Sequence, residues 1–136
     1  MELSRRFLLD TNAVIYLVSG RLVFPLPEGQ YSVSIITEIE LLSFSGLSAE
    51  EEQKIRELLL LLDRVHLTDA VRDETIRLRR KNRLKLPDAI IAASALTHDA
   101  ILLTNDQAFS SELLTFDQQL QSLMQVELNG RPTNPD

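Results

Sequence analysis

Apolar residues in this chain fall into short runs that alternate with stretches of helical periodicity. The runs are rich in aliphatic and β-branched residues, bounded by polar or turn-forming residues, and they have the length of buried strands. They predict strands at Phe7–Leu9, Tyr31–Ile35, Val65–Leu67 and Ala100–Thr104, with Met124–Leu128 as a candidate fifth.

The stretches between the predicted strands carry signals for helix starts and stops. Gly20 is placed to end the first helix, and Ser48 with Glu51 forms a capping-box pattern. Thr68 is a suitable N-cap, and Pro87 suits the first turn of a helix. We therefore expect helices over 11–18, 36–44, 48–62, from 68 into a basic segment, and 87–96, with 111–123 ambiguous but helical in character.

This alternation of strands and helices predicts an α/β fold, with a parallel sheet of about five strands sandwiched between helices. A chain of 136 residues is long enough for one domain with its own core. We assign residues 1–128 to that domain. The segment 129–136, NGRPTNPD, has no apolar anchor and is expected to be a disordered tail.

Composition excludes several classes of function. The chain has no cysteine, which removes disulfides, thiolate metal sites and thiol catalysis from consideration. The opening segment MELSRRFLLDTN reaches an acidic residue too soon to contain a secretory apolar region, and the longest apolar runs are too short to cross a bilayer. We therefore expect a cytoplasmic protein with no membrane partner.

The distribution of charge leaves a nucleic-acid partner open. The net charge is −6, yet six of the 14 basic residues fall between positions 77 and 85. A local basic segment can bind phosphates while the acidic remainder keeps the protein soluble. The simpler interpretation is a solvated helix face, and composition alone does not choose between the two.

Four acidic residues stand at positions where a parallel α/β sheet binds its ligands, the carboxyl ends of the strands. Asp10 and Asp106 follow the first and fourth predicted strands, Glu40 lies in the helix after the second, and Asp88 lies in a first helical turn. Each has an ordinary alternative as a helix cap, a dipole partner or a turn residue. Helical phase places Glu40, rather than Glu38, nearer the apolar side of its helix.

The conjunction of these acids predicts a metal site. Several carboxylates cannot gather in ionised form without a cation, because like charges disfavour one another's ionisation. All-oxygen ligands without cysteine select hard ions, so we expect Mg²⁺ or Mn²⁺. His66, in the predicted third strand, and His98, at a helix end, are interpreted as structural.

Four segments resemble, in order, the motifs of PIN-domain proteins, and most of all the VapC-type toxins of bacterial toxin–antitoxin pairs. The segments are LLDTN, SIITEIELL, LPDAIIAASA and LLTNDQAF, and the resemblance covers Phe7 to Phe109 and, more loosely, the chain to about Leu128. Any one motif is weak, whereas four in order at this length are specific.

The resemblance implies a function and a set of site residues. The family's acids fall on Asp10, Glu40, Asp88 and Asp106, with Thr37 as the threonine of the second motif. Members bind Mg²⁺ or Mn²⁺ through these acids and cleave RNA on a five-stranded parallel sheet sandwiched by helices. Toxin members usually form homodimers, and a small antitoxin inhibits them by placing its C-terminal segment in the active-site groove.

We therefore hypothesise hydrolysis of RNA by water activated at one or two metal ions, which leaves a 5′-phosphate and a 3′-hydroxyl. Side chains beside the acids are candidates to orient the metal ligands: Thr11, Asn12 and Thr104. Basic side chains preceding the third motif are candidates to contact RNA phosphates: Arg79, Arg80, Arg83 and Lys85.

Three alternatives stay open at this point. A catalytically inactive PIN-like module would bind RNA or protein without cleavage and would have no need to keep all four acids. A phosphotransfer receiver domain would need a lysine after its last strand, and no lysine follows Lys85. A DNA-cleaving, flap-type nuclease would have a similar metal site, but the chain is short for one that carries DNA-binding insertions.

Overall fold

The apolar runs pair side by side as a parallel sheet. In the computed structural model, which describes residues 5–20 and 26–104, the strands are β1 (Arg6–Leu9), β2 (Gln30–Ser34), β3 (Asp63–Val65) and β4 (Ile101–Leu103). Their order across the described sheet is β3-β2-β1-β4, and every pair is parallel. Leu9 lies between Val33 and Leu103 in register, so the carboxyl ends of these three strands meet at one edge.

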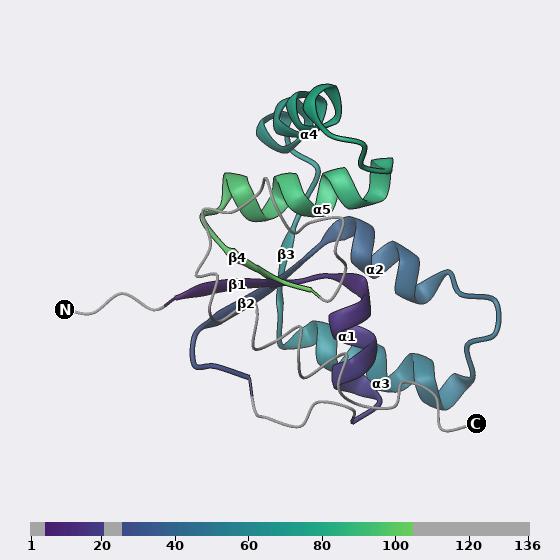
Figure 1. Cartoon of the computed structure of the whole chain (residues 1–136). Coiled ribbons are helices and arrows are strands. Elements are labelled where there is room, and N and C mark those ends of the chain that lie inside the picture. Colours follow the sequence, from purple (N-terminus) through teal and green to yellow (C-terminus); the bar gives the residue numbers. More distant parts are fainter. Residues whose placement is uncertain (1–4, 21–25, 105–136) are drawn as a thin grey trace.

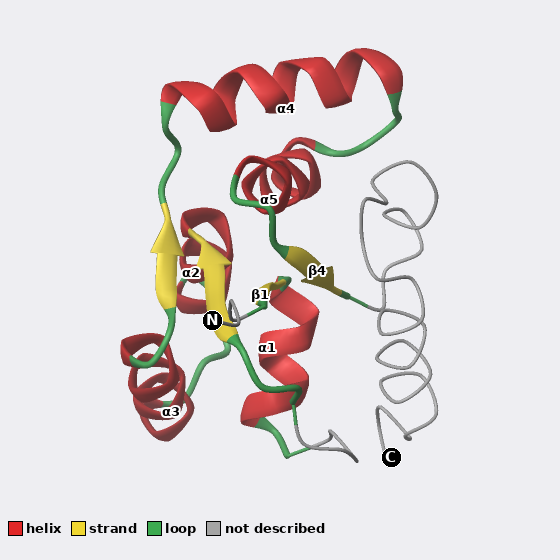
Figure 2. Cartoon of the chain, turned by 90° about the vertical axis from the view of Figure 1, so that its left-hand side faces the viewer, coloured by secondary structure: helices red, strands yellow, loops and turns green. Residues whose placement is uncertain are grey.

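Helices cover both faces of this sheet (Figure 1). They are α1 (Thr11–Val18), α2 (Ile35–Leu42), α3 (Ala49–Leu60), α4 (Asp69–Lys81) and α5 (Leu86–Thr97). The helices α1 and α3 lie on one side of the sheet, and α5 lies on the other (Figure 1). Figure 2 shows α4 outside α5, against which it makes most of its contacts. The predicted α/β sandwich with a parallel sheet is confirmed.

Polar side chains cap the N-termini of four helices by accepting hydrogen bonds from backbone N–H groups. Asp10, Ser34 and Thr68 cap α1, α2 and α4 in this way. Ser48 and Glu51 form the predicted capping box at the start of α3, with hydrogen bonds of 3.0 and 2.9 Å in the two directions. The start of α5 instead relies on a proline in its first turn.

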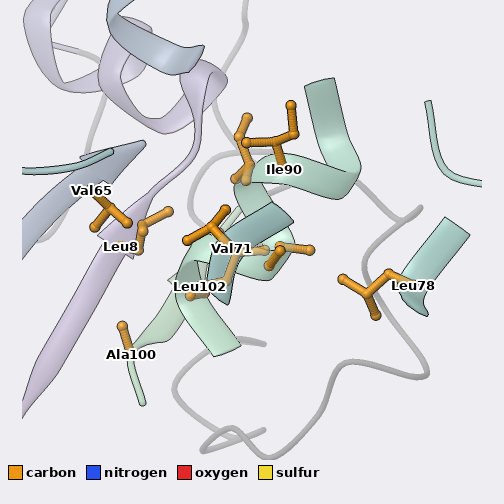
Figure 3. Packing of buried hydrophobic residues seen from close by; sticks show 11 residues of the cluster. Leu8, Val65, Val71, Leu78, Ile90, Ala100 and Leu102 are labelled. Atoms are coloured by element: carbon orange, nitrogen blue, oxygen red, sulfur yellow. The ribbon is translucent and has the colours of Figure 1, made fainter. Parts of the chain in front are cut away.

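The core has two parts because successive side chains of a strand point to opposite faces. Leu8 belongs to the cluster between the sheet and the α4–α5 layer, shown in Figure 3 with Val65, Val71 and Leu102. Phe7 and Leu9 belong to the cluster on the face covered by α1 and α3. The side chains of Phe7, Leu8 and Leu9 are all fully buried. A strand buried on both faces explains why β1 is almost continuously apolar.

Gly29 is required where the chain enters β2. Its φ is +157°, and a Cβ atom there would lie 2.6 Å from both the Arg5 carbonyl oxygen and the Phe7 ring. The next residue, Gln30, donates its N–H to that same carbonyl at 2.8 Å. Glycine therefore allows β2 to approach β1 closely.

The third strand lies earlier than predicted. Residues 65–67 were expected to form it, whereas β3 spans Asp63–Val65, with Asp63 beside Ser32 in register. His66 is exposed and lies outside the strand, so its expected place in an apolar strand was wrong. The strand β3 lies at one edge of the described sheet and pairs with β2 through backbone hydrogen bonds. It therefore tolerates polar side chains that the hydrophobic pattern would not assign to a strand.

Other boundaries shift by a few residues. The second helix ends at Leu42 rather than at Phe44, whose side chain is exposed. The predictions for 111–123, for a strand at 124–128 and for a tail at 129–136 fall outside the described residues. Among the helices described, none is long and apolar enough to span a membrane.

Candidate active site

The topology creates a crevice beside β1. From β1 the chain continues to β2 and β3 on one side, and then returns to place β4 on the other side of β1. Ligands of open parallel sheets bind at such a switch point, outside the strands' carboxyl ends. Asp10 follows β1 and Thr104 follows β4, and the Asp10 N–H donates to the Leu103 carbonyl at 3.3 Å.

Asp10 is a buried carboxylate held from two sides. Its side chain is 4% exposed. Its Oδ1 accepts the Ala13 backbone N–H at 2.8 Å, and its Oδ2 accepts the hydroxyl of fully buried Thr104. Asp10 is thus the N-cap of α1, which was the alternative interpretation of this residue from the sequence, and it also borders the cavity. Each carboxylate oxygen has further lone-pair capacity, so these hydrogen bonds fix the group without using up its ability to bind a ligand.

Glu40 is linked to the start of α1 through Thr11. The Thr11 hydroxyl lies 2.6 Å from Glu40 Oε1 and 3.1 Å from the hydroxyl of Thr37, which is fully buried. A hydroxyl has one proton, and the shorter contact is to the charged acceptor. Thr11 therefore donates to Glu40 and accepts from Thr37. This chain of two hydrogen bonds orients the Glu40 carboxylate.

Asp88 lies in the first turn of α5. Ile91, Ala92 and Ala95, which follow it on the same helix, are buried. The partial positive charge of a helix N-terminus stabilises a carboxylate at this position. The side chain is half-buried, which leaves it accessible from the crevice.

These acids share one open cavity of about 270 Å³. The residues that line it come from α1, its N-cap, α2 and α5: Asp10, Thr11, Asn12, Glu40, Asp88 and Ile91. Three of the four predicted acids and two of the three predicted orienting residues therefore border the same space. Within 5–20 and 26–104, no three carboxylate or imidazole groups are already arranged as a metal-binding group. Asp106, the fourth predicted acid, lies outside the described residues.

The helical-phase argument for Glu40 was wrong, although Glu40 does border the cavity. Ile39, which that argument placed on the buried side, is 53% exposed, and Glu40 is exposed as well. Glu38 is the more buried of the two acids and forms an ion pair with Arg64 of β3. The helix buries Thr37 and Leu41 instead. Thr37 had been named from the motif alone, and the apolar pattern gave no sign that its hydroxyl is buried.

Three of the predicted RNA-contacting residues lie together in a groove formed by α4 and the start of α5. This groove, of about 560 Å³, is lined by Thr75, Ile76, Arg79, Arg80, Asn82, Arg83, Leu84 and Leu86. We call it the α4–α5 groove. Lys85, the fourth predicted contact, is the exposed N-cap of α5 and does not line it.

Neither histidine borders the acidic cavity. The His98 imidazole Nδ1 lies 3.1 Å from the Ser94 carbonyl oxygen, at the C-terminal end of α5. The His98 carbonyl accepts a hydrogen bond from Arg6 at 3.1 Å. These contacts fit the predicted structural role of His98.

Comparisons with known proteins agree with this geometry. The family model described as PIN domain matches residues 7–112. A chain of a toxin–antitoxin complex from Klebsiella pneumoniae is 32% identical, with 77% of this chain and 91% of that chain covered and a TM-score of 0.65. A search of the curated proteins gave no match.

More distant structures share the fold. A chain of DNA-bound VapBC from Salmonella typhimurium is 19% identical, with a TM-score of 0.66 over 82% of this chain and 95% of that one. A chain of VapBC2 from Rickettsia felis, bound to a promoter DNA fragment, is 20% identical, with a TM-score of 0.62 over 76% and 90%.

Proposed function

The chain belongs to the PIN domain family, and on that premise we propose that it is a metal-dependent ribonuclease, the toxin of a toxin–antitoxin pair. The observation that carries this proposal is the convergence of Asp10, Glu40 and Asp88 on one cavity at the switch point of the sheet. We propose Asp106 as the fourth acid, because it follows β4 by three residues in sequence.

The donor set suits Mg²⁺ or Mn²⁺, because carboxylate oxygens with no cysteine nearby are the ligands of hard cations. Asp10, Glu40, Asp88 and Asp106 would hold the ion. When bound, it would supply Lewis acidity at the phosphodiester and lower the pKa of water. The protein's own part is positioning. Thr104 and the Ala13 N–H fix Asp10, while Thr37 and Thr11 fix Glu40.

RNA is the proposed substrate, and hydrolysis by water would leave a 5′-phosphate and a 3′-hydroxyl. Two features support it: the resemblance to VapC-type toxins, and the arginines of the α4–α5 groove close in sequence to Asp88. Arg79, Arg80, Arg83 and Lys85 are the proposed phosphate contacts.

A small antitoxin is the proposed protein partner, and a homodimer is the proposed assembly. The support for the antitoxin is that the 32%-identical chain belongs to a toxin–antitoxin complex. Light scattering should give the mass of two copies for the isolated chain. Co-expression with a short reading frame encoded next to its gene should yield a stable complex with reduced nuclease activity. A monomer, or a neighbouring product that neither binds nor inhibits, contradicts the respective proposal.

The central experiment measures cleavage of total cellular RNA by the wild type and by Asp10→Asn, with Mg²⁺, with Mn²⁺ and with EDTA. We expect metal-dependent cleavage by the wild type and a loss of at least 100-fold in the variant, as is common for residues acting in the transition state. Glu50→Gln, an exposed acid on α3, is the matched control and should retain full activity.

Four results would count against the proposal. Equal activity of Asp10→Asn and wild type would remove the acidic cavity as the active site. Activity that persists in EDTA would contradict the proposed dependence of cleavage on a metal ion. A 2′,3′-cyclic phosphate product would show attack by the ribose hydroxyl and not by water. Absence of cleavage together with no stabilisation by Mn²⁺ would favour an inactive binding module.

A further inference from the structure

The α4–α5 groove contains arginines that form no ion pair with a carboxylate of the described residues. On α4, Arg72 pairs with Asp69 and Asp73, and Arg77 pairs with Glu74. Within the part of the chain that the structure describes, Arg79, Arg80 and Arg83 take part in no ion pair. In a chain with 20 acidic and 14 basic residues, three such guanidinium groups around one groove indicate an anionic ligand.

The same groove also has apolar walls. Ile76 and Leu86 are 44% and 50% exposed, and both line the groove beside buried Leu84. Large aliphatic side chains at the surface, next to guanidinium groups, favour a ligand that has an apolar surface as well as negative charge. An unpaired nucleotide has both, since its base has an apolar face and its phosphate is an anion.

The polar side chains of the groove are already used inside the protein. The Thr75 hydroxyl donates to the Val71 carbonyl at 2.7 Å, and the Asn82 amide donates to the Leu78 carbonyl at 3.1 Å. The Thr75 hydroxyl proton is therefore unavailable to a ligand, whereas the Asn82 amide keeps a second N–H and its carbonyl oxygen. A base bound here would be held mainly by its faces.

The groove and the acidic cavity are both bordered by the first turn of α5, where Leu86 lines the groove and Asp88 lines the cavity. Side chains two residues apart in a helix point about 200° apart around its axis. The groove and the cavity therefore lie on different sides of this turn, and a nucleotide in the groove is a contact separate from the phosphate at the acids.

We infer that the α4–α5 groove binds an unpaired nucleotide of the substrate. Arg80 and Arg83 contact its phosphates, and Ile76 and Leu86 contact its base. This inference rests on the proposed function and deepens it, because it specifies single-stranded RNA at this subsite. A base within a duplex is stacked on its neighbours and would not fit.

The test measures binding by fluorescence anisotropy with the full chain in EDTA, where the proposed cleavage is absent. One probe is a labelled oligouridylate, and the second is an abasic oligomer with the same number of phosphates. We expect the wild type to bind the oligouridylate about tenfold more tightly, consistent with the contribution of stacked bases. A hairpin duplex should bind no better than the abasic oligomer.

Variants then separate the two kinds of contact. Leu86→Ala and Ile76→Ala should weaken oligouridylate binding about tenfold and leave abasic binding unchanged. Arg80→Gln and Arg83→Gln should weaken both probes and lower the slope of log K against log salt by about 0.7 each. Arg72→Gln lies on the same helix outside the groove and is the matched control. It should change neither probe's affinity by more than twofold.

If the wild type binds the oligouridylate and the abasic oligomer with equal affinity, the proposed base contact is contradicted, whatever the variants show. If Arg80→Gln and Arg83→Gln bind both probes as tightly as Arg72→Gln does, the proposed phosphate contact is contradicted. If groove variants leave RNA binding intact but reduce binding of a co-expressed antitoxin, the groove is a protein-docking surface and the inference fails. Cleavage by Asp10→Asn bears on the proposed function alone, because this binding assay does not depend on catalysis.

Discussion

The hydrogen bond from Thr104 to Asp10 should stabilise both the fold and the site. Thr104→Val keeps the shape of the side chain and removes the donor, so no cavity is formed. Both residues are buried, and the acceptor is a carboxylate. A hydrogen bond to a charged group contributes about 1.5–3 kcal/mol, and an abandoned buried acceptor adds its desolvation cost. We expect a loss of about 2 kcal/mol in the free energy of unfolding, or about 30-fold in the folding equilibrium.

Urea denaturation measures this loss, and thermal unfolding should show a decrease of about 6–8 °C in Tm. Thr104→Ser retains the hydroxyl and loses a buried methyl group, so it should cost only about 1 kcal/mol. A double-mutant cycle with Asp10→Ala isolates the pair. An interaction energy below about 0.5 kcal/mol would refute the reasoning, as would Thr104→Val being as stable as Thr104→Ser. If the proposed metal site is correct, Mn²⁺ affinity measured by calorimetry should fall about 10–100-fold in Thr104→Val.

Further predictions concern backbone and titrating groups. Gly29→Ala should lower the free energy of unfolding, measured by urea denaturation, by about 2–3 kcal/mol, because its Cβ would overlap the Arg5 carbonyl oxygen and the Phe7 ring. Gly20→Ala, with φ +72° and open space around it, should cost only about 1 kcal/mol, and equal costs would contradict the overlap. Burial raises the pKa of Tyr31 to about 12, so its neutral form is favoured in the folded state. Stability should therefore fall as the pH rises from about 10 to 12, and this fall should be smaller in Tyr31→Phe. Hydrogen bonds from Ser48 lower the pKa of Glu51, so their stabilisation is present above the ordinary glutamate pKa and is lost as the pH falls through the lowered value. Glu51→Gln, whose side chain cannot ionise, should be less stable than wild type at pH 7, and circular dichroism should show that the difference in stability narrows toward pH 3.

The sequence predicted the elements whose signals are local. Asp10, Ser48 and Thr68 were recognised as helix starts because an N-cap depends on residues three positions away. The strand β1 was recognised because burial on both faces leaves a continuous apolar run. The placement of an acid at the end of the first strand followed from the fold class alone, and Asp10 does border the acidic cavity.

Features that depend on tertiary contacts were not predictable in this way. The position of β3 is set by pairing with β2, and its polar residue Asp63 gave no strand signal. The orientation of α2 is set by buried Thr37 and by the Glu38–Arg64 ion pair, both of which an apolar periodicity treats as surface. The α4–α5 groove required the turn between two helices, for which the sequence showed only a run of basic residues.

The adjacency of β1 and β4 also governs when the site can form during synthesis. The hydrogen bond that fixes Asp10 joins residues 94 positions apart. Contacts so distant in sequence form slowly and only after the later segment is available. A nascent or truncated chain that ends before β4 has Asp10 without its Thr104 donor and β1 without its neighbouring strand. For a protein proposed to destroy RNA, this topology keeps the carboxylate unassembled until most of the chain has left the ribosome.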